Sequence, residues 1–160
     1  MTRIDEVIGP HAARIEVRPW IIVLFAVGGS FLIYAHLLGL SFFGDDFRAV
    51  WRAGLGTEPG PAGFFRPLSD WSIRLEHAIF GNAPQGYRAF NVLVHGLNVF
   101  VLIRLGQCLN DVQGKRGPNL VPYLAGLLFL CYPFHNEAVI WIVGRGASMA
   151  TLFTLLALWA

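Results

Sequence analysis

Two adjacent aspartates, Asp45 and Asp46, directly follow a long apolar run of the chain. A carboxylate at such a position can act as a general base on an acceptor hydroxyl or amine. Two arginines further along, Arg66 and Arg145, could hold the phosphate of a lipid-linked donor, because a guanidinium binds phosphate oxygens in pairs. If these groups meet at one membrane face, their chemistry predicts group transfer from a lipid phosphate at that face.

A second set of polar residues lies within or beside apolar segments. Asn91, His95 and Asn98 are spaced four and three apart, which places them on one face of a helix. His135 and Glu137 form a short polar turn and could also supply acid or base. Polar residues inside membrane segments favour a functional role as the first hypothesis. The alternative, which stays open, is that the amides only join helices and that the turn is solvated.

The acid pair and the arginines also have a structural interpretation. Asp45 and Asp46 could end a membrane span in water, and Arg145 could be a snorkelling anchor. Arg66 could belong to a plain loop. Histidines and carboxylates leave a divalent cation open as a cofactor, but no spacing of metal ligands supports a metal site, and none is predicted.

The composition predicts a membrane protein. Of the 160 residues, 55% are hydrophobic and only 14% are charged, where soluble domains carry about a quarter charged residues. A formal net charge of +2 gives no sign of a nucleic-acid partner. Cys108 and Cys131 lie in or beside apolar segments and are expected to be small buried hydrophobes rather than a disulfide.

Apolar runs predict an all-α membrane protein with three to four transmembrane helices. The predicted spans are residues 20–43, 87–109, 120–134 and 147–160, after a cytoplasmic tail at 1–19. The loop at 44–86 is predicted to contain a short helix at 67–80, where Leu68, Trp71 and Leu75 repeat at helical spacing. That helix would lie in the membrane interface, or pack as a soluble helix on a small loop domain.

The last apolar segment is about 21 Å long as a helix, too short to cross a bilayer unaided. The membrane domain at 20–160 is therefore expected to be truncated. Three arginines before residue 19 and the pair Lys115 and Arg116 predict that the N-terminus is cytoplasmic. The loop at 44–86 and the turn at 134–145 would then share the outer face.

Five motifs occur together in a fixed order. They are Gly-Asp-Asp-Phe at 44–47, Phe-Arg-Pro-Leu at 65–68, the glycine-rich segment 81–88, Asn-x-x-x-His-x-x-Asn at 91–98, and the segment 133–145 that ends in Gly-Arg. With these motifs the chain resembles the N-terminal part of polytopic GT-C glycosyltransferases. The closest likeness is to the protein O-mannosyltransferase-like group that often carries tetratricopeptide repeats.

The resemblance implies inverting transfer of a sugar from a polyprenyl-phosphate donor at the outer face. The membrane is expected to be a bacterial inner membrane. The resemblance also implies that Asp45 or Asp46 is the catalytic base. The donor and substrate would be bound by a larger set: Arg66, Asn91, His95, Asn98, His135, Glu137 and Arg145.

One departure concerns the segment after Gly-Arg, where Gly146, Ala147 and Ser148 lack an aspartate that related sequences often have. The later spans of such enzymes are also absent. Catalysis by these 160 residues alone is therefore left open. The alternative is a non-catalytic structural subunit of a membrane complex, built on a truncated transferase scaffold. Expected partners are membrane lipid, the polyprenyl-phosphate sugar and other membrane subunits.

Overall fold

The computed structural model describes residues 17–57, 66–114 and 119–160. Throughout these residues the regular structure is helical, without a β-strand, so the predicted all-α class is confirmed. The helices are α1 (Pro19–Val23), a π-helical turn (Leu24–Gly28), α2 (Gly29–Tyr34), α3 (Asp45–Gly54), α4 (Pro67–Phe80), α5 (Pro84–Val112), α6 (Val121–Cys131), α7 (Asn136–Ile140) and α8 (Arg145–Trp159). Short 3₁₀ turns follow α2, precede α7 and precede α8.

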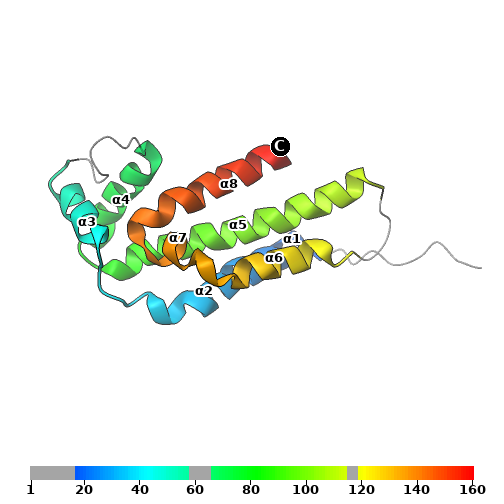
Figure 1. Cartoon of the computed structure of the whole chain (residues 1–160), viewed down its shortest axis with the longest axis horizontal. Helices are drawn as coiled ribbons and strands as arrows, with labels where there is room; N and C mark the ends of the chain where they lie inside the picture. The colour runs from blue at the N-terminus through cyan, green and yellow to red at the C-terminus, as the bar shows by residue number, and fades with distance from the viewer. Residues whose placement is uncertain (1–16, 58–65, 115–118) are drawn as a thin grey trace, which may run out of the picture.

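Three helical stretches are long and apolar enough to cross a membrane: Pro19–Leu37, Pro84–Val112 and Ile142–Trp159. The apolar helix α6 has 11 residues, which corresponds to about 16 Å. The central element is α5, with α8 along one side and α6 with the first span along the other (Figure 1). Its 29 residues extend about 43 Å, beyond the roughly 30 Å of a hydrocarbon core.

The first span crosses α5 at a glycine. A Cβ built on Gly96 would lie 2.8 Å from the Cα of Val27, so only a residue without a side chain permits this approach. On the N-terminal side of this crossing in the first span, Ile22 and Ala26 pack against Val99 of α5, in a cluster that also includes Ile103 and Leu130. Close backbone contact through glycine is typical of packing between membrane helices.

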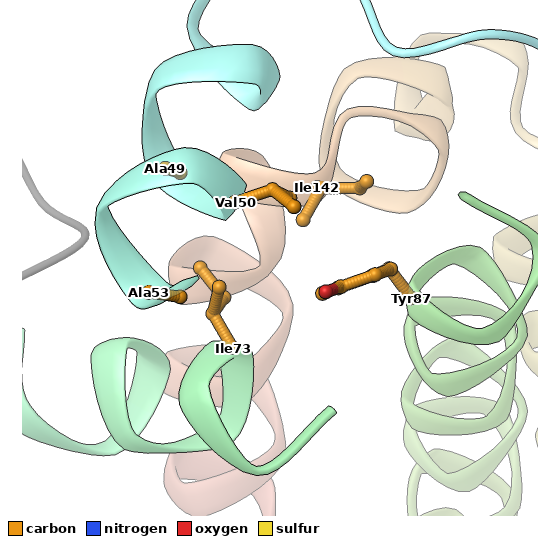
Figure 2. Close-up of a cluster of buried hydrophobic side chains, with 6 residues drawn as sticks. All are labelled: Ala49, Val50, Ala53, Ile73, Tyr87 and Ile142. Carbon is orange, nitrogen blue, oxygen red and sulfur yellow. The ribbon is translucent and has the colours of Figure 1, made fainter. Parts of the chain in front are cut away.

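Helices α3 and α4 lie together at the end of the bundle where α5 begins (Figure 1). The helix predicted at 67–80 is α4, whereas α3 was not predicted. Gly44 leads into α3 with a φ of 55°, a conformation that favours glycine. Ala49, Val50 and Ala53 of α3 meet Ile73 of α4, and Tyr87 and Ile142 complete this cluster from the membrane helices (Figure 2).

Some sequence-based predictions fall outside the described residues. They are the tail at 1–16, Phe65 in the second motif, and the basic pair Lys115 and Arg116 that supports the predicted orientation.

Candidate functional site

The connection between α7 and α8 is where polar side chains from distant segments meet. Asp46, in the first turn of α3, accepts a hydrogen bond from the backbone N–H of Val143 at 3.3 Å, across 97 residues of sequence. This contact brings the acid pair and the turn leading to Arg145 to the same end of the bundle. The structure therefore joins two of the motifs that the sequence analysis singled out.

Asp45 and Asp46 differ sharply in their environment. Asp45 is exposed, whereas Asp46 has no exposed surface, and its second carboxylate oxygen has no hydrogen-bond partner. Burial raises the pKa of Asp46 to about 6, against the opposing effects of the Val143 N–H and the positive charge of Arg88. A carboxyl group that titrates near neutral pH inside a protein is a feature of functional sites.

Arg88, near the start of α5, holds the connection after the first span. Its guanidinium donates to the carbonyl oxygens of Leu38 (3.4 Å), Leu40 and Ser41 (2.7 Å). Its Nε donates to the Ile140 carbonyl at 3.2 Å. One buried side chain thus fixes both the approach to Gly44 and the end of α7, the two segments on which Asp46 depends.

The two asparagines of α5 each donate a hydrogen bond to the segment that runs from the end of α7 into α8. Asn91 donates through Nδ2 to the carbonyl of Trp141 at 3.2 Å. Asn98 donates through Nδ2 to the carbonyl of Ser148 at 3.0 Å. Both side chains are buried, and the Oδ1 atom of each has no partner. Each amide therefore retains an unused acceptor next to the segment that it holds.

The structure brings His95 and His135 together. Their rings are 5.2 Å apart between centroids, and His95 also stacks on Phe129 and meets the edge of Tyr34. His135 is half-buried, with its Nδ1 3.0 Å from the carbonyl oxygen of Phe129. The Nε2 atom of His95 is buried without a partner. This aromatic cluster connects the first span, α5 and the turn after α6.

Arg145 lies in a separate network at the start of α8. Its Nη1 is 2.7 Å from Glu76 Oε1 and 2.9 Å from Ser72 Oγ, both on α4. Its Nη2 donates to the carbonyl of Tyr87 at 3.3 Å, and the guanidinium lies over the ring of Phe90. Burial raises the pKa of Glu76, while the hydrogen bond and charge of Arg145 lower it. Arg145 is thus bound to a carboxylate of this chain.

The remaining residues predicted for the site lie at the surface. Arg66 is exposed beside the start of α8, since a Cβ built on Gly146 would be 3.9 Å from Arg66 Cδ. Glu137 is exposed in the first turn of α7. The chain therefore presents Asp45, Arg66 and Glu137 to the surroundings, leaves His135 half-buried and encloses the other predicted residues.

Sequence reasoning missed two charged residues of these networks, Arg88 and Glu76. Arg88 carried a usable signal, because an arginine inside an apolar helix requires several buried acceptors. Glu76 had no such signal, since a single acid on a short amphipathic helix is usually solvated. As for a metal, no three His, Cys, Asp or Glu side chains gather in an arrangement that could hold a metal ion across the described parts of the chain.

Comparison with known proteins identifies relatives that share the name protein O-mannosyl-transferase. The chain is 34% identical over 145 residues to "Protein O-mannosyl-transferase TMTC2" of Mus musculus, and the matched segment covers 79% of this chain and 17% of that protein. It is 30% identical over 153 residues to "Protein O-mannosyl-transferase Tmtc2" of Drosophila melanogaster, covering 83% and 16%. It is 36% identical over 117 residues to "Protein O-mannosyl-transferase TMTC1" of Mus musculus, covering 73% and 12%.

These relatives are much longer than the chain, which spans about a sixth of the first two. No protein-family model matches the sequence, and no solved structure is significantly similar to it.

Proposed function

This chain is a homologue of the protein O-mannosyl-transferases TMTC1 and TMTC2, and from that premise we propose that it contributes the acceptor side of a glycosyltransferase site. The reaction is transfer of a sugar, mannose by analogy with the relatives' names, from a polyprenyl-phosphate donor to a protein hydroxyl. The apolar helices and these homologues make the chain an integral membrane protein, so a lipid-linked donor would reach the site from the bilayer.

The base in this proposal is Asp45. A general base must come within about 2.6–3.2 Å of the proton that it removes, and of the acid pair only Asp45 is exposed. The acceptor hydroxyl gives its proton to Asp45 while its oxygen attacks the anomeric carbon. The bond from that carbon to the donor phosphate breaks, and the polyprenyl phosphate leaves with the electron pair. Asp46 positions Asp45 by holding the start of α3 on Val143.

The donor phosphate is assigned to Arg66 rather than Arg145. Arg66 is exposed beside the start of α8, where its guanidinium can reach an anion at the membrane surface. Arg145 is fully buried beside Glu76, so an anion at the membrane surface does not reach its guanidinium. In this assignment Arg145 holds α4 in place, and the exposed Glu137 is available to the acceptor.

The observation that carries the proposal is the contact of Asp46 with Val143, because it gathers the acid pair and the Gly-Arg segment at one end of the bundle. We place that end on the outer face, with the N-terminus in the cytoplasm, on the strength of the basic residues in the sequence. A bacterial inner membrane stays a prediction, and the three relatives described above are animal proteins.

The test replaces Asp45 by Asn in the complete protein that contains this chain. Membranes carrying it are supplied with a radiolabelled polyprenyl-phosphate mannose, and transfer of label to protein is measured. Loss of a general base costs about 10²–10⁴-fold in rate, so D45N should lose nearly all transfer at unchanged protein abundance. Asp111→Asn, the same chemical change at the far end of α5, is the matched control.

Transfer by D45N at the wild-type rate would remove Asp45 as the base. If D46N lost transfer at unchanged protein abundance while D45N kept it, the base would be Asp46, the buried aspartate. A smaller loss for Arg66→Gln, seen as a raised KM for the donor, is expected from a phosphate-binding role.

A further inference from the structure

An apolar groove lies between the first span and α6, in the half of the bundle away from α3 and α4 (Figure 1). Its walls include Ile21 and Phe25 of the first span and Leu124 and Leu127 of α6, and buried Ile103 of α5 forms its floor. The groove has a volume of about 320 Å³. It is therefore roughly twice as large as an engineered apolar cavity that binds benzene.

Both walls of the groove are held on α5 by glycines. A Cβ built on Gly126 of α6 would lie 2.4 Å from Ile103 Cγ1, and the first span crosses α5 closely at Gly96. The two walls meet at Gly29 of the first span, where a Cβ would be 3.0 Å from Leu130 Cδ2. Neither helix can move further toward the other without losing this close packing. The opening between them is therefore built into the fold.

The walls of the groove suit a hydrocarbon ligand. Of the lining side chains that the structure describes, only Tyr123 carries a polar atom, and its hydroxyl accepts a hydrogen bond from Gln107 Nε2 at 2.8 Å. An empty apolar space lacks dispersion contacts along its walls, and water gains no hydrogen bonds there. A flexible hydrocarbon chain from the surrounding bilayer restores those contacts.

The groove has the depth of one leaflet. Its residues on the first span run from Val17 to Phe25, about 12 Å along a helix, against roughly 15 Å for half of a hydrocarbon core. The spanning stretch begins at Pro19, so the exposed Arg18 lies at the headgroup level. The exposed Trp20 is typical of the same boundary. A lipid chain that enters here has apolar walls along its length and a guanidinium beside its phosphate.

Two other occupants fit the groove less well. The lipid-linked donor is assigned to the opposite end of the bundle, where Arg88 holds the candidate site. Arg88 and Ile103 are about 22 Å apart along α5. A further transmembrane helix is about 10 Å across, so it could cover the groove but not enter it.

We propose that this groove binds one acyl chain of a glycerophospholipid, whose phosphate lies at Arg18. The bound chain fills the opening that the fixed positions of the first span and α6 leave between them. The proposal does not depend on the sugar-transfer reaction, because it rests only on the packing of three helices and on the charge at the mouth of the groove.

Native mass spectrometry of the full chain tests the proposal, with phosphatidylglycerol as the probe. We expect the wild type to keep one bound lipid through a detergent exchange that removes the others. Leu124→Trp fills the groove and should lower this occupancy severalfold. Leu128→Trp is the matched control, because it makes the same change one turn along α6 at a position that is 72% exposed and outside the groove. Its occupancy should equal that of the wild type.

The cation at the mouth is tested by Arg18→Gln, which should lose part of the occupancy, whereas Arg48→Gln, exposed at the far end of the bundle, should lose none. Circular dichroism checks that each variant is folded, and Ile21→Trp blocks the groove from the opposite wall if L124W does not fold. Equal occupancy in L124W, I21W and L128W would overturn the proposal, and so would a wild type that keeps no lipid.

Two further outcomes would assign the groove to another occupant and overturn the proposal. Displacement of phosphatidylglycerol by an equimolar amount of polyprenyl phosphate would make the groove a site for the donor's tail. Loss of the bound lipid in a longer protein that contains this chain, with the lipid retained by the chain itself, would show that a protein segment fills the groove.

Discussion

Two buried charged groups of this chain are held in opposite ways. Arg145 is fully buried, and its guanidinium contacts Glu76, Ser72 and a backbone carbonyl. Asp46 is equally buried, but it accepts one long backbone hydrogen bond and leaves one oxygen without a partner. The first arrangement neutralises a charge with an opposite charge and several hydrogen bonds. The second keeps a carboxyl group poorly compensated.

The difference distinguishes groups that stabilise the fold from groups that belong to the reaction site. A buried ion pair with good geometry resists change, because removal of either partner leaves an uncompensated charge. A buried carboxyl without an ion pair costs stability and is retained where its proton equilibrium or its position is useful. On this basis the Arg145 network fixes α4 and α8, and the Asp46 turn belongs to the candidate site.

The largest expected effect comes from removing Glu76. Glu76→Ala leaves Arg145 buried without its counter-charge, which costs roughly 3–5 kcal/mol in comparable pairs. We expect a large fall in the melting temperature of the purified protein in detergent, measured by circular dichroism. Arg74→Met, an exposed change two residues away on α4, should leave it unchanged.

The double variant E76L/R145M makes that comparison sharper. Buried ion pairs can often be replaced by apolar residues of similar volume at little cost, so the double variant should recover most of the stability lost by E76A. If E76A melts at the wild-type temperature, the Arg145 network is not a stabilising pair and the contrast with Asp46 fails.

A smaller effect is expected from the titration of Asp46. Its pKa is raised from 3.8 to about 6 in the folded protein, so the folded state binds the proton more tightly than the unfolded state. The associated stability is present in full below about pH 4 and is lost as pH rises through 6. The loss is at most about 3 kcal/mol.

The measurement is the free energy of unfolding of wild type and D46N between pH 4 and 7. Asn resembles the protonated acid, so D46N should lack this part of the pH dependence. Glu76 also has a raised pKa and shifts both curves alike, which is why the difference between the proteins is informative. Parallel curves for the two proteins would show that Asp46 titrates normally.

Much of the fold could be predicted from the sequence because it follows from apolar runs. The spanning helices and α4 have patterns that depend on their own residues alone. Helix α3 was missed because its stability depends on contacts with Ile73, Tyr87 and Ile142, which come from other segments. The inward polar face of α4 was also inaccessible, since hydrophobic periodicity shows that two faces differ but not which one is buried.

The candidate site was predicted in its residue types more than in its geometry. The motifs pointed to Asp46 and the Gly-Arg segment, and their meeting required the fold. Sequence could not show that Arg145 is bound to Glu76, because an ion pair across 69 residues leaves no local pattern. It also could not distinguish Asp45 from Asp46, since adjacent identical residues differ only in burial.

The smallest expected effect concerns Asn98, which extends the comparison along α5. Its amide donates to the Ser148 carbonyl at 3.0 Å, and hydrogen bonds between membrane helices are worth about 0.6 kcal/mol on average. If Asn98 only joins helices, N98A should lose about that much stability and keep sugar transfer, and Asn82→Ala in an exposed turn should lose none. Loss of transfer with stability intact would instead assign Asn98 a role in the transfer reaction, because a group that matters to turnover but little to folding acts on the reaction site rather than on the fold.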